Sequence, residues 1–282
     1  VSFGIAGVFV PLIELWTDDL ITQYSILTGV SVMTAIAILL IKVPAYMGAS
    51  LDKRKFRVAA APTKGTYYVE GLLSVCAFCL IGGKVTVSSY IEDYVEDTSS
   101  LPDKDKTWAL AVLWIAITVG RILGLKDQIG LKNKEQLYTH LTAWLICGSI
   151  GMLFMMIWTS SYWATWLGLI LYGFGNGPCV GYVYDLNNRI TIPSELGMAI
   201  VMFGLNFGAS IVPYAAAQLW DATGWAYWLV LITFITMVTP MTFVHLTKLF
   251  ESEEIGLKHA VAPPQARRAA ASESPRSESA PV

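Results

Sequence analysis

Lys84 is the most unusual ionisable residue of the sequence, because it interrupts a long uncharged stretch. The residues from Gly71 to Gly83 carry no charge, and none follows Lys84 until Glu92. If this stretch spans a bilayer, a lysine at such a depth costs about 2.5–3.5 kcal/mol on insertion scales. Lys84 lies roughly ten residues, or about 15 Å, from the outer end of the stretch, which is too far for a lysine stem to reach water. An ionisable residue held inside a span is a candidate functional residue.

Two asparagines also lie inside apolar segments, where a polar side chain is costly. Asn176 and Asn206 each carry an amide that needs partners, since an unpaired amide costs about 1–3 kcal/mol in an apolar setting. Interhelical hydrogen bonds would satisfy these amides, and so would a polar solute in a cavity. Pro178 and Pro213 follow in the same segments and are expected to interrupt the helices, which is tolerated where a span faces protein or a water-filled cavity.

Glycines four residues apart mark three of the apolar segments. The pairs are Gly120 and Gly124, Gly173 and Gly177, and Gly204 and Gly208. Glycines at this spacing let two helix backbones approach closely in lipid. Helix packing is therefore one interpretation, and a motif that supports conformational change is the other. Arg121, inside the first pair, either marks the cytoplasmic boundary of its span or belongs to such a motif.

The composition indicates a polytopic membrane protein. Hydrophobic residues make up 55% of the 282 residues and charged residues only 14%, whereas a soluble domain carries about 25% charged residues. The net charge of −2 suggests no nucleic-acid partner. The four cysteines lie in apolar segments without the second Cys or His pair of a zinc site, so neither a metal nor a cofactor is expected. The common signatures of soluble enzymes do not occur, and the chain is not expected to be an enzyme.

Eight segments are apolar enough to be membrane spans, for which roughly 20 mostly apolar residues are needed. They are residues 2–16, 20–43, 67–94, 108–125, 138–158, 162–184, 196–220 and 226–249. The first is short, and we expect it to be the remainder of a helix that begins in a preceding N-terminal portion.

The basic residues orient these spans. If the connector 44–66 is cytoplasmic, strict alternation places all 19 Lys and Arg residues on the cytoplasmic side except Lys84, Lys104 and Lys106. The positive-inside rule predicts such an asymmetry. The C-terminal tail, 251–282, is then cytoplasmic. It is rich in Ala, Pro, Ser and Arg and has no aromatic residue, which predicts disorder.

Three motifs carry a resemblance to a known family. The sequence GRILGLKDQIG at 120–130 is similar to the second copy of the cytoplasmic G-R-x-x-G signature of major facilitator superfamily transporters. The sequence GFGNGP at 173–178 resembles the glycine-rich tenth span of that family. Residues 193–213, followed by WDATGW at 220–225, resemble its eleventh span and the outer turn after it. At a finer level, the segment with Gly82, Gly83 and Lys84 resembles the seventh span of the branch of fucose–proton symporters and sodium-dependent glucose transporter-like proteins, in which an acid stands in place of the lysine.

The resemblance implies an all-α membrane protein with the major facilitator fold. The chain would supply eight transmembrane helices, which correspond to spans 5–12 of a twelve-span carrier. Residues 1–43 would be the last two spans of the N-terminal half, and 44–66 the cytoplasmic central loop. Residues 67–250 would form the C-terminal six-helix bundle, and 251–282 the disordered tail.

The implied function is secondary active or facilitative transport of a small polar solute, sugar-like or an organic anion, by alternating access. A receptor or scaffold without flux and an incomplete, inactive fragment are the alternatives. The expected partners of such a solute carrier or symporter are the solute, a coupling proton or sodium ion, and the lipid bilayer.

The candidate cavity residues are Lys84, Asn176, Asn206, Trp114 and Tyr90, and the candidate gating residues are Arg121 and the six paired glycines. Lys84 would attract an anionic group of the solute or pair with a carboxylate of the preceding half. Because a straight helix would aim Lys84 away from Thr86 and Tyr90, Gly82 and Gly83 are expected to loosen the helix and turn Lys84 into the cavity.

We expect the connector 44–66 and the tail 251–282 to lie on the same side of the membrane. Glycosylation or protease sites inserted into the two segments measure this, with a site in the acidic connector 95–107 as the control for the opposite side. A tail found on the opposite side from connector 44–66 would contradict the eight-span assignment, because one missed span reverses the tail.

Overall fold

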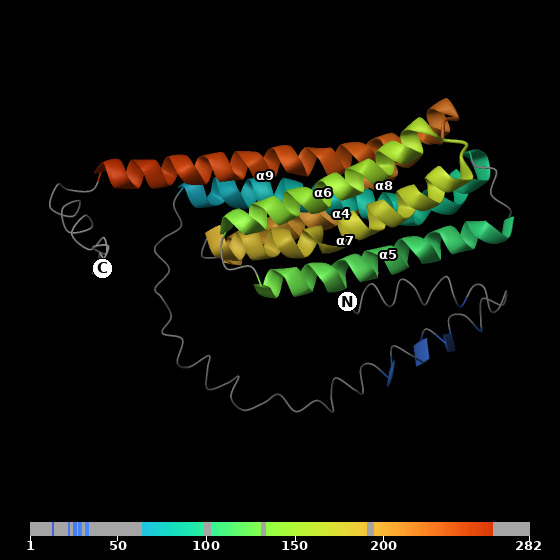
Figure 1. Ribbon diagram of the computed structural model, residues 1–282, viewed down its shortest axis with the longest axis horizontal. Coiled ribbons are helices and arrows are strands. Elements are labelled where there is room, and N and C mark those ends of the chain that lie inside the picture. The colour runs from blue at the N-terminus through green and yellow to red at the C-terminus, as the bar shows by residue number, and fades with distance from the viewer. Residues whose placement is uncertain are drawn as a thin grey trace, which may run out of the picture.

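The computed structural model describes six long helices and the turns between some of them. The described residues are 64–98, 103–130, 134–190 and 195–261, together with isolated positions between 13 and 33. The helices are α4 (Lys64–Thr98), α5 (Asp103–Gly130), α6 (Lys134–Ile157), α7 (Tyr162–Ile190), α8 (Glu195–Thr223) and α9 (Tyr227–Val261). Figure 1 shows them lying side by side with successive helices antiparallel. We call one end of the bundle the inner end. Helices α4, α6 and α8 begin there, and α5, α7 and α9 end there.

Helix α4 lies at the centre of this bundle. It packs most extensively on α8 and α9 and also touches α5 and α7, while α7 packs between α5 and α6. The core runs through these contacts and includes the buried Leu73, Leu80 and Tyr94 of α4 and Tyr172 and Tyr182 of α7. The central helix is therefore the one that carries Lys84.

Five of the six helices, all but α7, are long and apolar enough to cross a membrane. Helix α7 has a similar length, but glycines, tyrosines and asparagines lower its hydropathy. Large apolar side chains such as Ile122, Trp163 and Phe203 are exposed on the outside of the bundle, as expected for a surface that meets lipid. The chain is a multi-pass membrane protein.

The structure shows six of the eight predicted helices. The predicted spans 2–16 and 20–43 lie outside the described residues apart from isolated positions. Helix α9 continues to Val261, past residue 250, where the sequence placed the start of the tail.

Helices α5 and α7 meet backbone to backbone along their glycines. A Cβ added to Gly173 would lie 2.8 Å from Leu113 O, and one added to Gly177 would lie 2.5 Å from Ile117 O. Real Cβ atoms do not approach other atoms so closely, so any side chain here would force the helices apart. The second glycine pair of the sequence therefore packs α7 on α5, as small residues do between helices in lipid.

The first glycine pair, on α5, packs against α7 near Pro178. A side chain on Gly120 would overlap Phe174 O, and one on Gly124 would overlap the Pro178 ring. Pro178 cannot donate to Phe174 O, so α5 approaches α7 at the carbonyl that the proline leaves open. The prediction that Pro178 and Pro213 interrupt their helices is wrong, because α7 and α8 run through them. Packing of neighbouring helices supports such prolines within membrane helices.

The third glycine pair packs α8 on α4. Side chains on Gly204 and Gly208 would overlap Ser74 and Phe78 O, respectively. The hydroxyl of Ser74 donates to Ile200 O at 2.8 Å and adds a polar link between the same two helices. All three pairs thus serve helix packing within the bundle.

The expectation that Gly82 and Gly83 loosen the helix is also wrong, because α4 is continuous from Lys64 to Thr98. Gly82 faces Val212 of α8, whose Cγ2 would lie 2.5 Å from an added Cβ. Gly83 faces Thr236 of α9 and the hydroxyl of Tyr172 of α7. Because the two glycines have no side chains, helices α7, α8 and α9 pack closely against the middle of α4. This packing keeps α4 regular.

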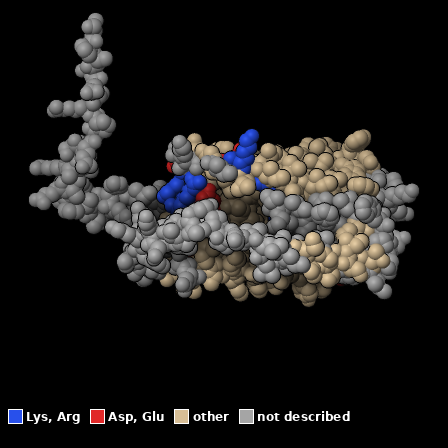
Figure 2. All heavy atoms as spheres, turned by 90° about the horizontal axis from the view of Figure 1, so that it is seen from below, with Lys and Arg blue, Asp and Glu red and all other residues tan. Residues whose placement is uncertain are grey.

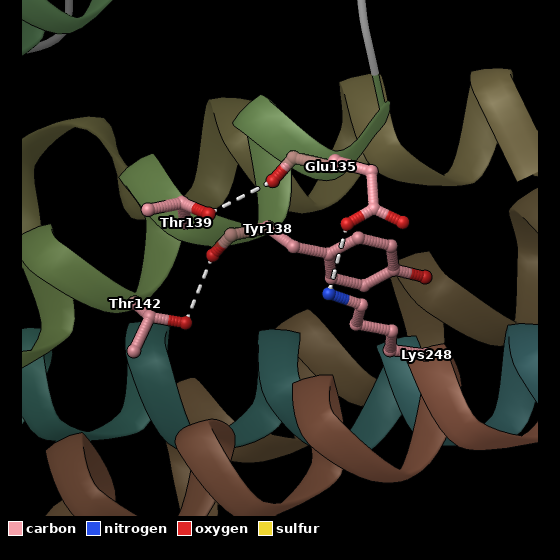
Figure 3. A network of polar contacts seen from close by, with 5 residues as sticks. All are labelled: Glu135, Tyr138, Thr139, Thr142 and Lys248. Carbon is pink, nitrogen blue, oxygen red and sulfur yellow. Dashed lines mark hydrogen bonds and ion pairs between the residues drawn. The ribbon is translucent and has the colours of Figure 1, made fainter.

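Lys248 links α9 to α6 at the inner end. Its Nζ lies 3.1 Å from Oε2 of Glu135 and 6.0 Å from the centroid of the Tyr138 ring (Figure 3). The hydroxyls of Thr139 and Thr142 donate to the carbonyl oxygens of Glu135 and Tyr138, one turn earlier in α6. Since the ion pair is largely exposed, it contributes at most about 1 kcal/mol and mainly orients the helix ends.

Replacing Gly120 by Ala should destabilise the bundle by about 1–3 kcal/mol, because the methyl group has no room at Phe174 O. The matched control is Gly71→Ala, since nothing lies within 4 Å of a Cβ at that position of α4. Removing a helix glycine there should stabilise the protein by up to about 1 kcal/mol. Thermal unfolding in detergent measures both, and equal effects of the two substitutions would contradict the close contact.

Candidate functional site

Lys84 lies inside the bundle, with 4% of its surface exposed. It follows Gly83, which the side chains of Thr236 and Tyr172 cover. Arg121 lies half-buried on α5, which packs on α4. A buried lysine and a half-buried arginine therefore lie on two helices in contact.

Arg121 faces a cavity between α5 and α7. Its Nε donates to Gly177 O at 3.3 Å, so the guanidinium is held on the glycine contact between the helices. The cavity has a volume of about 290 Å³. It is lined by Arg121, Leu125 and Gln128 of α5 and by Gly177, Pro178, Val180, Gly181 and Tyr184 of α7. This volume lies near the lower end of the range for small-molecule sites.

Gln128, Gly181 and Tyr184 are among the cavity residues that were not candidates from the sequence. The spacing of these residues in the sequence could have indicated them. Gln128 follows Arg121 by seven residues, and Gly181 and Tyr184 follow Gly177 by four and seven, so each set lies on one helix face. Gly181 and Gln128 face each other, since a Cβ on the glycine would lie 3.3 Å from Nε2 of the glutamine.

Asn176 joins three helices and is 1% exposed. Its Nδ2 donates to Leu80 O of α4 at 3.2 Å and approaches Sδ of Met237 of α9 at 3.3 Å. Its Oδ1 is buried and has no hydrogen-bond partner among the residues that the structure describes. The amide thus makes the interhelical bond that the sequence offered as one of two possibilities.

Asn206 lies elsewhere, on the exposed side of α8. Its Nδ2 donates to Met202 O of its own helix at 2.9 Å, and its backbone carbonyl accepts from Ser210 at 3.2 Å. Helix α8 packs on α4 and α9, whereas Asn176 projects from α7. Within the described helices, the two asparagines do not form one site.

Tyr90 and Trp114 are half-buried and pack against the core of the bundle. Tyr90 stands on α4 beyond Lys84 toward the outer end, and Trp114 stands on α5. The carbonyl of Trp114 accepts a hydrogen bond from Thr118 at 2.8 Å. Both aromatic residues therefore belong to the two helices that carry Lys84 and Arg121.

Charge is unevenly distributed over the bundle. Figure 2 shows the visible Lys and Arg side chains gathered toward one end, with acidic side chains beside them and a hollow nearby. At the inner end of α7, Arg189 and Asp185 form an ion pair at 2.9 Å. Asp127 of α5 lies 3.9 Å from His140 of α6. These ion pairs of α5, α6 and α7 therefore lie at the inner end of the bundle.

Comparison with known protein families and with curated proteins finds no match. Among solved structures, the chain is similar to that of a major facilitator superfamily transporter, FucP, in the outward conformation, with a TM-score of 0.55 and 17% identity. The likeness covers 80% of this chain and 54% of the FucP chain. The six-helix bundle thus has the major facilitator fold, and the chain spans about half of the FucP chain.

Asn176→Ala should destabilise the protein by about 1 kcal/mol, because it removes the bond from α7 to α4. Asn206→Ala should change stability by less than about 0.5 kcal/mol, because its bond lies within one exposed helix turn. Thermal unfolding of both variants in detergent gives the comparison. A larger loss for Asn206→Ala would contradict the different environments of the two amides.

Proposed function

We propose that this chain supplies spans 5–12 of a twelve-span carrier that moves a small polar solute across a membrane by alternating access. The observation that supports it most is the cavity between α5 and α7, which places a guanidinium, an amide and a phenol inside a bundle with the major facilitator fold. Polar groups are costly within a membrane protein, and they commonly mark solute pathways.

The packing of α4 through α9 suits a half that moves as one body. Glycine contacts join α5, α7 and α6, and a second set joins α8 to α4, so the helices have little room to slide past one another. Rocking of this half against the preceding one would open a midplane site to each side in turn. Coupling to a proton or a sodium ion is part of the proposal, with the basic inner end and the C-terminus in the cytoplasm.

Proteoliposomes that hold the full-length protein should show saturable counterflow of at least one member of a panel of sugars and organic acids. The chain of residues 1–282 by itself should show none, because it supplies only one complete six-helix half. Empty liposomes are the control for leakage. A folded full-length protein that binds a panel member without any counterflow would favour a receptor or scaffold and contradict transport.

A further inference from the structure

A fully buried carboxylate lies on α4 near the inner end. Glu70 is the seventh residue of α4, and none of its surface is exposed. Both oxygens of its carboxylate are buried. A buried carboxylate is costly in its charged form unless its surroundings stabilise that charge. The groups around Glu70 therefore decide whether it holds a proton.

The start of α8 surrounds this carboxylate. A Cβ added to Gly197 would overlap the carboxyl carbon and both oxygens of Glu70, so the carboxylate lies where a side chain at position 197 would be. Helix α8 begins at Glu195, and Gly197 belongs to its first turn. The N–H groups of a first helical turn have no acceptor within the helix, and the helix dipole makes this end positive. The start of α8 therefore favours the charged form of Glu70.

Glu70 also continues the face of α4 that packs on α8. Ser74, Phe78 and Gly82 follow it at intervals of four residues, and each of them contacts α8. Residues four apart lie on the same side of a helix. Of these four residues, only Glu70 has a titratable side chain. A change in its charge therefore acts on the packing of α8 against α4.

Other titratable groups lie toward the inner end of the helices that surround α4. Ion pairs join six of them: Asp127 with His140, Asp185 with Arg189, and Lys248 with Glu135. Further charged residues are Lys64 of α4, Arg121 and Lys126 of α5, Lys134 of α6, Glu195 of α8, and His245 and residues 251–259 of α9. Substitution of Glu70 separates its titration from the titration of these groups.

We propose that Glu70 is a proton-binding site that controls the inner end of α8. In its charged form, the carboxylate accepts hydrogen bonds from the first-turn N–H groups of α8 and holds them on α4. One proton, taken from water at the inner end, cancels the charge and its attraction to the helix dipole, so the first turn of α8 loosens. This inference concerns the bundle itself and does not depend on the proposed transport function.

A spin label at Leu196, an exposed residue in the first turn of α8, measures this motion. The label is placed on the full-length protein in a cysteine-free background and in lipid nanodiscs. A change from neutral to mildly acidic buffer should increase the mobile population of the label about fivefold, since a helix cap and the dipole interaction contribute by about this factor. In Glu70→Gln, the label should be mobile in both buffers, because no titratable group remains at this position.

Hydrogen exchange at neutral pH gives a second measurement, on the amides of residues 195–200. Glu70→Gln should speed their exchange about fivefold because it removes the charge. Gly197→Ala should do the same, because its methyl group would take the place of the carboxylate. Asp93→Asn, which changes an exposed acid toward the outer end of α4, is the matched control and should leave this exchange unchanged.

Three results would overturn the inference. The first is a label at Leu196 whose mobility is the same in both buffers when Glu70 is present, and this measurement is independent of any folding defect in a Glu70 variant. The second is an equal response to acid in Glu70→Gln, because another group would then bind the proton. The third is unchanged exchange in both Glu70→Gln and Gly197→Ala. None of these measurements involves transport, so they leave the proposed function to its own test.

Discussion

The close contact between the backbones of α5 and α7 is the constraint on which the rest of the structure depends. Gly173 and Gly177 of α7 face backbone atoms of α5, and Gly120 and Gly124 of α5 face backbone and proline atoms of α7. Lipid gives helices no hydrophobic reason to associate, so contact of this kind supplies the packing energy. It also fixes the rotation of both helices, which decides which side chains lie inside.

That rotation positions the charged groups. Because Gly177 carries the carbonyl to which Arg121 donates, the contact that joins the helices also holds the guanidinium at the edge of the cavity. On the central helix α4, Gly82 and Gly83 leave space for α8 and α9, and the adjacent Lys84 is buried. Close helix packing thus decides where both cations lie in the bundle.

Features that depend on composition and local spacing were predictable from the sequence. Long apolar runs predicted the helices, and glycines four apart predicted close packing, because both follow from one segment at a time. The WDATGW turn is a further case: Gly224 adopts a positive φ of 69° and ends α8 with a bond from its N–H to Trp220 O at 2.7 Å.

Features that depend on neighbouring helices were not predictable. Pro178 removes one hydrogen bond, yet α7 stays continuous because α5 packs at that place. The burial of Lys84 depends on how neighbouring helices pack around α4, which no single segment encodes. Asn176 and Asn206 look alike in the sequence, but one reaches across to α4 and the other bonds to its own helix.

The central claim is that α4 through α9 form one rigid body, and electron–electron distance measurements test it most directly. Spin labels at the exposed positions Leu123 of α5 and Phe203 of α8, in a cysteine-free background, report distances within the bundle. A second pair, Phe203 with Val32 of the predicted span 20–43, reports motion of that segment relative to the bundle. The account predicts that adding solute changes the distance distribution of the second pair and leaves that of the first unchanged. A change in the Leu123–Phe203 distances as large as that of the second pair would contradict it.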